Sequence, residues 1–206
     1  MDNLIFWTNP MSRGRIVRWM LEECGAQYET RVVEYGPEMK SDSYRALNPM
    51  GKVPVVQAGE TVVTECAAIC CWLAEAFPEA GLIPDPGARG DFYRWMFFAA
   101  GPVEAAVTAA SFGFDPQDAQ GARRAGWGTL ASVADTLETL LADGRPWLLG
   151  DGFSAVDVYL GSQINWGQSF GTLPERAGFA DYAARITTRP AAIRAKALDD
   201  ALTPAP

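Results

Sequence analysis

The first part of the chain alternates short apolar runs with one-sided helical patterns. Residues 3–7 form an apolar run that ends in a Thr-Asn-Pro turn, which predicts a buried strand. Residues 12–24 carry apolar side chains at helical spacing with arginines between them, and Gly25 is a typical helix stop. Residues 28–35 are rich in β-branched and aromatic residues and predict a second strand. The chain therefore begins as a β-α-β unit.

A hairpin and a helix complete this first part. Residues 53–56 and 61–63 predict two short strands, joined by a tight turn at Gly59 and Glu60. Residues 64–77 return to a helix-favouring pattern. The pattern up to this point is β-α-β, a connecting segment, then β-β-α.

A segment rich in proline and glycine, residues 77–90, predicts an exposed link between two domains. Strand patterns almost disappear beyond it. Alanine-rich, helix-favouring segments follow, separated by glycine or proline: 88–112, 117–142, 154–166, 175–187 and 190–201. We therefore expect a mixed α/β domain over residues 1–80 and an all-helical domain over residues 88–206.

The composition restricts the chemistry, because the 206 residues include no histidine. This excludes a Ser-His-Asp or Cys-His catalytic set, a histidine-ligated metal and an imidazole general base within the chain. Any reaction must use hydroxyls, thiols, carboxylates, lysine, arginine or main-chain dipoles.

The charge argues against two classes of partner. The chain has 17 basic and 25 acidic residues, a net charge of -8, and no stripe of lysine or arginine. Nucleic acids and anionic membranes both favour basic surfaces, so we expect neither as a partner. The N-terminus lacks the pattern of a signal peptide, and no window approaches the length of a membrane span. We therefore expect a cytoplasmic protein. Its four cysteines form no CxxC pair, and free thiols are expected.

The segment Lys52-Val53-Pro54-Val55 carries a proline among strand residues, where it cannot donate to the ladder. A cis peptide bond before Pro54 would turn the Val53 main chain outward, so that it could pair with an extended peptide-like ligand. A trans proline at the start of a strand is the alternative.

The helix that begins at Thr64, Glu65 and Cys66 offers unpaired main-chain N–H groups at the positive end of its dipole. A ligand carboxylate could bind the amides of Glu65 and Cys66, and the Glu65 side chain could hold an ammonium group. Together these suit an α-amino acid. In the alternative interpretation Thr64 is an N-cap and Glu65 a favourable first-turn acid.

The turn over residues 8–15 follows the first strand, and ligands gather at the carboxyl ends of strands in open α/β sheets. Ser12, close to Arg13 and Arg15, could donate a hydrogen bond to a bound thiolate and lower the thiol's pKa. Ser12 could also be a simple N-cap, and the arginines solvated helix charges.

In order and spacing, these motifs resemble those of the cytosolic glutathione transferases of a bacterial type. The resemblance covers essentially the whole chain. It includes a stretch from Trp147 to Asp157, in which Ser154 and Asp157 would form a capping box before the central helix of the second domain. The resemblance implies a thioredoxin-like first domain that binds glutathione, followed by an all-helical domain.

The resemblance also implies roles for single residues. The Val53 main chain would pair with the cysteinyl part of glutathione, Glu65 and Cys66 would hold the γ-glutamyl end, and a lysine would meet the glycyl carboxylate. The implied glutathione-binding residues are Asn9, Met11, Arg13, Lys40, Lys52, Val53, Pro54, Glu65 and Cys66.

Family members activate the thiol with a Tyr, Ser or Cys near the end of the first strand, where this chain has Phe6 and Trp7. Ser12 is the candidate, with Thr8, Asn9 and Arg13 as competitors. Alignment without a gap places the family's hydroxyl at Met11. The family also commonly has serine where this chain has Cys66, whose thiol could form a mixed disulfide with glutathione.

The resemblance implies a transferase that conjugates glutathione to hydrophobic electrophiles in detoxification, as a homodimer and with glutathione as co-substrate and no metal. The electrophile would bind between the domains, near Trp95, Phe98, Phe112 and Trp166, although aromatic residues at helical spacing are more often core. The alternatives are a glutathione-dependent disulfide reductase or isomerase, and a noncatalytic glutathione-binding protein.

Overall fold

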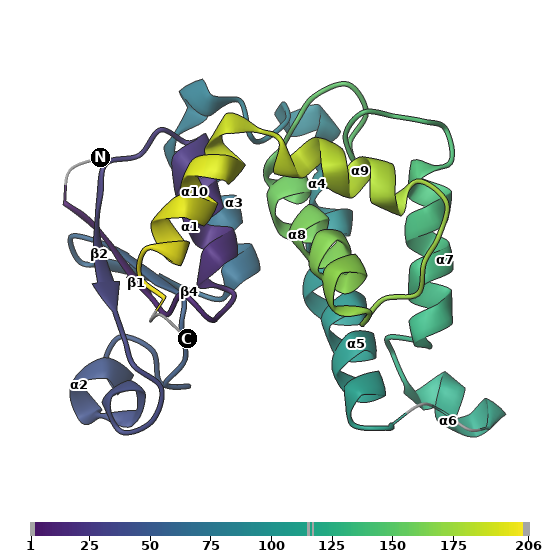
Figure 1. Cartoon of the computed structure of the whole chain (residues 1–206), viewed down its shortest axis with the longest axis horizontal. Coiled ribbons are helices and arrows are strands. Elements are labelled where there is room, and N and C mark those ends of the chain that lie inside the picture. Colours follow the sequence, from purple (N-terminus) through teal and green to yellow (C-terminus); the bar gives the residue numbers. More distant parts are fainter. Residues whose placement is uncertain (1–2, 115, 117, 204–206) are drawn as a thin grey trace. The chain divides into compact units, whose positions relative to one another are not determined.

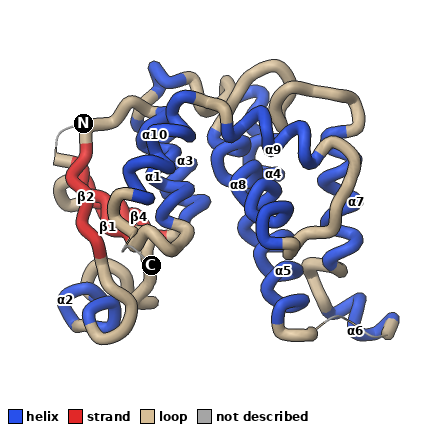
Figure 2. Tube along the Cα trace, viewed as in Figure 1, coloured by secondary structure: helices blue, strands red, loops and turns tan. Residues whose placement is uncertain are grey.

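The computed structural model describes residues 3–114, 116 and 118–203 (Figure 1). Its internal contacts divide these residues into two units. The first unit comprises the described residues up to Ile83 together with those from Thr188 onward, and the second is Pro84–Thr187. Within the described residues, all four strands of the sheet belong to the first unit (Figure 2).

The elements of the first unit follow the predicted β-α-β and β-β-α order, and the predicted thioredoxin-like fold is confirmed. In chain order they are β1 (Leu4–Thr8), α1 (Gly14–Glu23), β2 (Tyr28–Val32), η1 (Glu38–Lys40), α2 (Asp42–Arg45), β3 (Val55–Ala58), β4 (Thr61–Thr64), α3 (Cys66–Ala76), η2 (Pro78–Ala80) and, near the C-terminus, α10 (Pro190–Asp200).

The second unit is helical, as predicted for the second domain. Its elements are η3 (Pro86–Ala88), α4 (Arg89–Phe98), η4 (Ala99–Val103), α5 (Glu104–Ser111), α6 (Ala119–Arg124), α7 (Leu130–Leu141), α8 (Ala155–Phe170) and α9 (Phe179–Thr187).

The sheet has the strand order β2-β1-β3-β4, with β1 and β2 parallel and the other two pairs antiparallel. Side chains alternate across it. Phe6 is fully buried beneath the guanidinium of Arg18 of α1, whereas Trp7 faces the other way and packs edge-on against Tyr44 of α2. The sheet is therefore covered on both faces, by helices on one side and by the η1–α2 segment on the other.

Helix α10 packs on α1 (Figure 1), so it belongs to the first unit although the predicted boundaries placed it in the helical domain. Three ion pairs join the two antiparallel helices, Arg15–Asp200, Arg18–Asp199 and Glu22–Arg194, and a fourth joins Glu23 to Arg189, the N-cap of α10. Composition alone makes residues 190–201 a helix. Which helix this segment packs against depends on the charged residues of α1, which are far from it in the sequence.

Two long predicted helices are interrupted. The segment 88–112 becomes α4 and α5 joined by the π-helical turn η4, which contains Pro102. The segment 117–142 becomes α6 and α7, because Gly128 takes a positive φ of 73° and Thr129 begins α7 with a capping box to Ser132. The interruptions follow local proline and glycine chemistry.

Candidate functional site

The register of the sheet brings three separate segments to one end. Val55 of β3 lies opposite both Trp7 of β1 and Thr64 of β4. Because β3 is antiparallel to its two neighbours, its start lies beside their ends. The turn after β1, the residues before β3 and the start of α3 therefore meet at the same end of the sheet.

A direct contact joins two of these segments. The Cys66 thiol, which begins α3, donates to the main-chain oxygen of Arg13 with a sulfur–oxygen distance of 3.8 Å. Cys66 is buried, with 8% of its surface exposed. The start of α3 thus rests against the start of α1, and the positive ends of two helix dipoles face one region.

The residues before β3 present free main-chain groups. The Val53–Pro54 peptide bond is cis, one of the two conformations considered from the sequence. Val53 is half-buried, and within the described part of the chain neither its N–H nor its C=O has a hydrogen-bond partner. An unpaired N–H and C=O on one residue can pair with an extended peptide-like ligand.

Glu65, at the N-cap of α3, has a strained backbone with φ 64° and ψ 118°. A positive φ on a residue other than glycine costs about 1–3 kcal/mol and persists where the surroundings enforce it, often at ligand sites. Its side chain makes no capping hydrogen bond among the described residues. The first amides of α3 therefore remain available to an anion such as a carboxylate.

Asn9 shapes the turn after β1 from the inside. Its Oδ1 accepts a hydrogen bond from the Met11 N–H at 2.9 Å, and its Nδ2 donates to the Val33 carbonyl at 3.1 Å. Asn9 is 4% exposed, and Thr8 before it is fully buried. Both residues hold the turn in place.

Ser12 is half-buried at the start of α1. Its hydroxyl donates to the Asn9 carbonyl at 2.6 Å and accepts from the Gly14 N–H at 2.9 Å. Gly14 is required here, since a Cβ on it would lie 1.9 Å from Oγ1 of Thr8. The Ser12 proton must leave the Asn9 carbonyl before it can be donated to a ligand.

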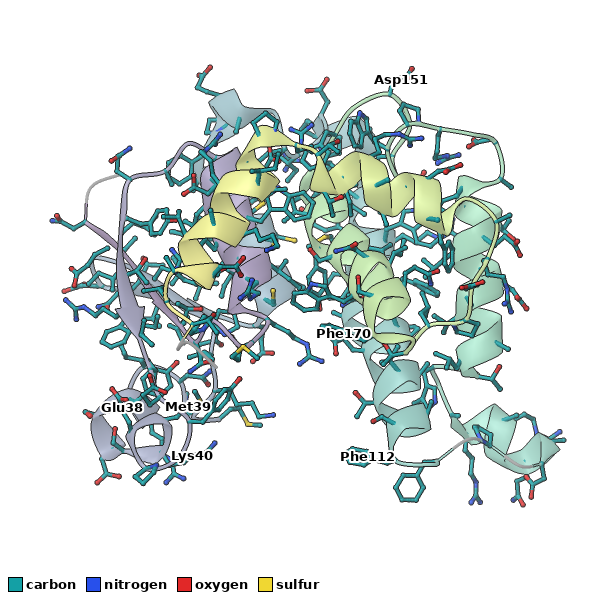
Figure 3. All side chains as sticks on the ribbon, in the orientation of Figure 1. Glu38, Met39, Lys40, Phe112, Asp151 and Phe170 are labelled. Carbon is teal, nitrogen blue, oxygen red and sulfur yellow. The ribbon has the colours of Figure 1, made fainter. Side chains whose placement is uncertain are left out.

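The two predicted lysines differ. The Lys40 ammonium donates to the carbonyls of Gly51 at 2.6 Å and Met50 at 3.2 Å, so it braces the loop before β3. Lys52 is exposed, and among the described residues its ammonium has no partner. Figure 3 shows Lys40 beside Met39 and Glu38 on the η1–α2 segment.

The turn after β1 has an exposed rim that the sequence analysis only partly anticipated. Arg13 is exposed at the N-cap of α1, and Met11 is 68% exposed. The Tyr35 hydroxyl donates to the Met11 carbonyl at 3.1 Å and braces this rim. Arg15 is turned away, because its guanidinium pairs with Asp200 and the Pro10 carbonyl.

The four predicted electrophile-site residues all lie in the helical unit. Trp95 is 6% exposed and packs edge-on against the half-buried Phe98, with ring centroids 5.4 Å apart. Trp166 is half-buried on α8. Phe112 is 71% exposed at the end of α5 (Figure 3). Trp95 is therefore largely core, whereas the other three present apolar surface.

The four cysteines are free thiols that gather around α3 and the end of α1. Burial, with the carboxylate of Glu23, raises the pKa of Cys24 to about 12. Burial, with the carboxylate of Glu75, raises the pKa of Cys71 to about 11. A hydrogen bond to Cys66, together with burial, raises the pKa of Cys70 well above its ordinary value.

The described ranges contain neither a metal-binding cluster nor a helix that could cross a membrane. No group of three or more cysteine, aspartate or glutamate side chains there could hold a metal ion. The helices of the same ranges include none with the length and apolar character needed to cross a membrane.

Comparisons with known proteins match both parts of the chain. Residues 11–76 match the glutathione S-transferase N-terminal domain, and residues 120–166 match the C-terminal domain. A probable glutathione S-transferase, GSTU6 of Oryza sativa subsp. japonica, is 30% identical over 173 residues, which cover 78% of this chain and 69% of that protein. The chain belongs to the glutathione S-transferase family.

Solved structures agree with this family membership. A glutathione transferase from Methylococcus capsulatus superposes with a TM-score of 0.78 at 26% identity, covering 96% of this chain and 99% of that one. A theta class glutathione S-transferase from Xanthomonas axonopodis pv. citri, with glutathione bound, has a TM-score of 0.71 at 27% identity, covering 95% and 97%.

Two features that hold the loops of the site in this transferase-family chain were not predicted from the sequence. Tyr35 is one. The other is a pair of Asn-Pro-Met turns, at residues 9–11 and 48–50, in which each asparagine accepts from the methionine N–H. The Asn48 amide also donates to the Lys52 carbonyl, just before Val53. The repeated tripeptide was a usable signal, because asparagine before proline favours turns.

Proposed function

We propose that this protein is a glutathione transferase that binds glutathione at the end of the sheet where β1, β3 and β4 meet. The observation that carries the proposal is the start of α3. There a strained Glu65 leaves the first amides of the helix without a side-chain cap, next to the unpaired main chain of Val53. Family membership, and the glutathione bound to a relative that is 27% identical, support glutathione as the ligand.

In this proposal each part of glutathione meets a different group. The γ-glutamyl carboxylate accepts hydrogen bonds from the Glu65 and Cys66 amides, and the Glu65 carboxylate holds the ammonium. The Val53 N–H and C=O pair with the cysteinyl main chain. Lys52 is the lysine that remains for the glycyl carboxylate, because Lys40 is engaged by Gly51.

Ser12 stabilises the thiolate. On binding, its hydroxyl rotates from the Asn9 carbonyl towards the sulfur and donates its hydrogen bond there, while the dipole of α1 adds positive potential. Both effects lower the pKa of the bound thiol, whose proton leaves to solvent. The thiolate then attacks an electrophilic carbon, a carbon–sulfur bond forms, and the leaving group departs with the bonding electron pair.

The apolar acceptor contacts the aromatic surface of the helical unit. Phe98, Trp166 and Phe112 present such surface, and the buried Trp95 packs edge-on against Phe98. Apolar contacts of this kind tolerate many shapes. We further propose a homodimer in the cytoplasm, as the family resemblance implies.

The test measures glutathione binding by calorimetry and turnover with 1-chloro-2,4-dinitrobenzene, a model aromatic halide. Ser12→Ala should lower kcat/KM about 100-fold, as loss of one hydrogen-bond donor to an anion does. It should also raise the pKa in the pH–rate profile and leave glutathione affinity within a few-fold. Ser111→Ala is the control, because Ser111 is an exposed serine that also donates to a main-chain carbonyl.

Unchanged turnover in Ser12→Ala would assign thiol activation to another group. Glutathione binding by the wild type without turnover, either with the halide or with a small mixed disulfide, would make the chain a glutathione-binding protein. Turnover with the disulfide alone would favour a reductase that uses the same site.

A further inference from the structure

Arg15, on the first turn of α1, links the turn after β1 to the C-terminal helix. Its Nε donates to the Pro10 carbonyl at 2.6 Å, and its Nη1 donates to Oδ1 of Asp200, the last residue of α10, at 2.8 Å. Because α10 runs antiparallel to α1, its end lies beside the start of α1 (Figure 1). One guanidinium therefore joins the turn to a segment that is far from it in the sequence.

The Pro10 carbonyl lies in the middle of the turn that carries Ser12. Within this turn, the Met11 N–H donates to Oδ1 of Asn9, and the Ser12 hydroxyl donates to the Asn9 carbonyl. These bonds fix the internal shape of the turn. The bond from Arg15 is different, because it closes the turn against the first residues of α1. It therefore helps to set where Ser12 lies relative to the helix.

The guanidinium is itself held from the side of α10. Besides the bond from Nη1 to Asp200, its Nη2 donates to Oγ1 of Thr203 at 3.5 Å, and the Thr203 hydroxyl donates to the Asp199 carbonyl at 3.1 Å. An arginine presents its N–H groups in a rigid planar fork. A carboxylate that fixes Nη1 consequently fixes the direction in which Nε points, which is towards Pro10.

We propose, on the basis of the proposed function, that Arg15 is a positioning residue of the transferase reaction and that Asp200 orients it. Arg15 acts through the turn: by holding the Pro10 carbonyl, it keeps Ser12 where its hydroxyl can rotate to the glutathione sulfur. A misplacement of about 1 Å can cost on the order of 100-fold in rate. Glutathione affinity, which depends in the proposed function on the residues before β3 and at the start of α3, does not depend on this contact.

The first test removes the guanidinium. Arg15→Gln should lower kcat with 1-chloro-2,4-dinitrobenzene about 10-fold, raise the pKa in the pH–rate profile, and leave the Kd for glutathione within a few-fold. Arg15→Lys keeps the cation without the planar fork and should recover only part of the loss. In the Ser12→Ala background, Arg15→Gln should have almost no further effect, because Arg15 acts through Ser12.

The matched control is Arg194→Gln. It breaks the Glu22–Arg194 ion pair, which joins the same two helices away from the turn. Neither kcat nor the pKa in the pH–rate profile should change in this variant. Equal effects of Arg194→Gln and Arg15→Gln would assign the loss to the packing of α10 on α1 and overturn the proposal.

Asp200→Asn separates positioning from charge, because the two predict opposite signs. The variant removes a negative charge beside Arg15, and through space alone this lowers the pKa of the bound thiol. Loss of orientation weakens the hydrogen bond from Ser12 to the thiolate and raises that pKa instead. We expect a raised pKa and a smaller loss of kcat than in Arg15→Gln. A lowered pKa, or full recovery of kcat by Arg15→Lys, would overturn the proposal.

Hydrogen exchange tests the positioning without turnover. In the free ¹⁵N-labelled protein, the Met11 and Gly14 amides, which donate to Asn9 and Ser12, should exchange faster in Arg15→Gln than in Arg194→Gln. Unchanged exchange would overturn the proposal even if turnover fell. If the wild type binds glutathione without any turnover, the proposed function is wrong, and the exchange rates still decide whether Arg15 holds the turn.

Discussion

From the sequence, Ser12, Asn9, Thr8 and Arg13 are all candidates to stabilise the thiolate. Hydrogen bonds and burial distinguish the first three. Thr8 is fully buried, and both polar groups of the Asn9 side chain are used inside the turn. Ser12 is half-buried, and rotation about one bond frees its proton. Ser12 is therefore the residue of these three that the proposed function uses to stabilise the thiolate, and the exposed Arg13 stays the other candidate. The Ser12 hydroxyl also accepts from the Gly14 N–H, although the N-cap of α1 is Arg13.

At the same scale, the buried thiols are expected to react slowly. Burial moves the pKa of Cys24 from 9.0 to about 12, so at pH 8 its thiolate fraction is about 1,000-fold lower than that of an ordinary cysteine. Pulsed alkylation with iodoacetamide at pH 8, read by peptide mass spectrometry, should label Cys24 correspondingly slowly. Labelling in concentrated urea is the control. Equal rates in the folded and unfolded chain would contradict the assigned environment.

At the scale of elements, helix α8 depends on one buried carboxylate. The predicted capping box of Ser154 and Asp157 is confirmed. Asp157 is fully buried and accepts from the main-chain N–H groups of Leu148 and Ser154, from the Ser154 hydroxyl and from the Tyr182 hydroxyl. It thereby ties the preceding loop, the helix start and α9 together.

Replacing this carboxylate should destabilise the protein strongly. Asp157→Ala leaves the Leu148 and Ser154 N–H groups and the Tyr182 hydroxyl buried without their acceptor, at about 1–3 kcal/mol for each lost partner before relaxation. We expect a loss of about 2–5 kcal/mol in the free energy of unfolding, measured with urea. Asp151→Ala, on the exposed loop labelled in Figure 3, should change it by less than about 0.5 kcal/mol. Equal effects would contradict the cap.

At the scale of the whole molecule, the last helix, α10, belongs to the first unit although the second unit precedes it in the chain. Helix α10 binds α1 through ion pairs, of which Arg18–Asp199 is buried with side-chain exposures of 2% and 1%. Removing one partner of a buried pair leaves an uncompensated charge. The stability of the first unit therefore depends on residues more than 180 positions from its start.

This arrangement predicts a local effect. Asp199→Asn should accelerate hydrogen exchange of amides in α1, β2 and α10, while amides of α7 and α8, in the other unit, keep their protection. Asp200→Asn is the control, since Asp200 is a half-exposed neighbour. Equal loss of protection in α7 and α8 would contradict the division into units.

The same pair has a pH signature. Burial raises the pKa of Asp199 above its ordinary 3.8, so in the window just above pH 3.8 the folded state keeps a proton that the unfolded state has released. The stability of the wild type relative to Asp199→Asn should therefore fall as pH rises through this window, and level off above the folded pKa. Urea unfolding at a series of pH values measures it, and an opposite slope would contradict the assignment.

Local sequence patterns are enough to predict the order of elements, the helical second part and the segments around the site. Strand and helix periodicity, and the turn chemistry of glycine, proline and asparagine, act over a few residues and are visible locally. Three features cannot be predicted from those patterns: α10 packs on α1, Lys40 braces a loop, and Glu65 takes a positive φ. Those outcomes depend on contacts between residues far apart in the chain, where burial and ion pairing override local preference.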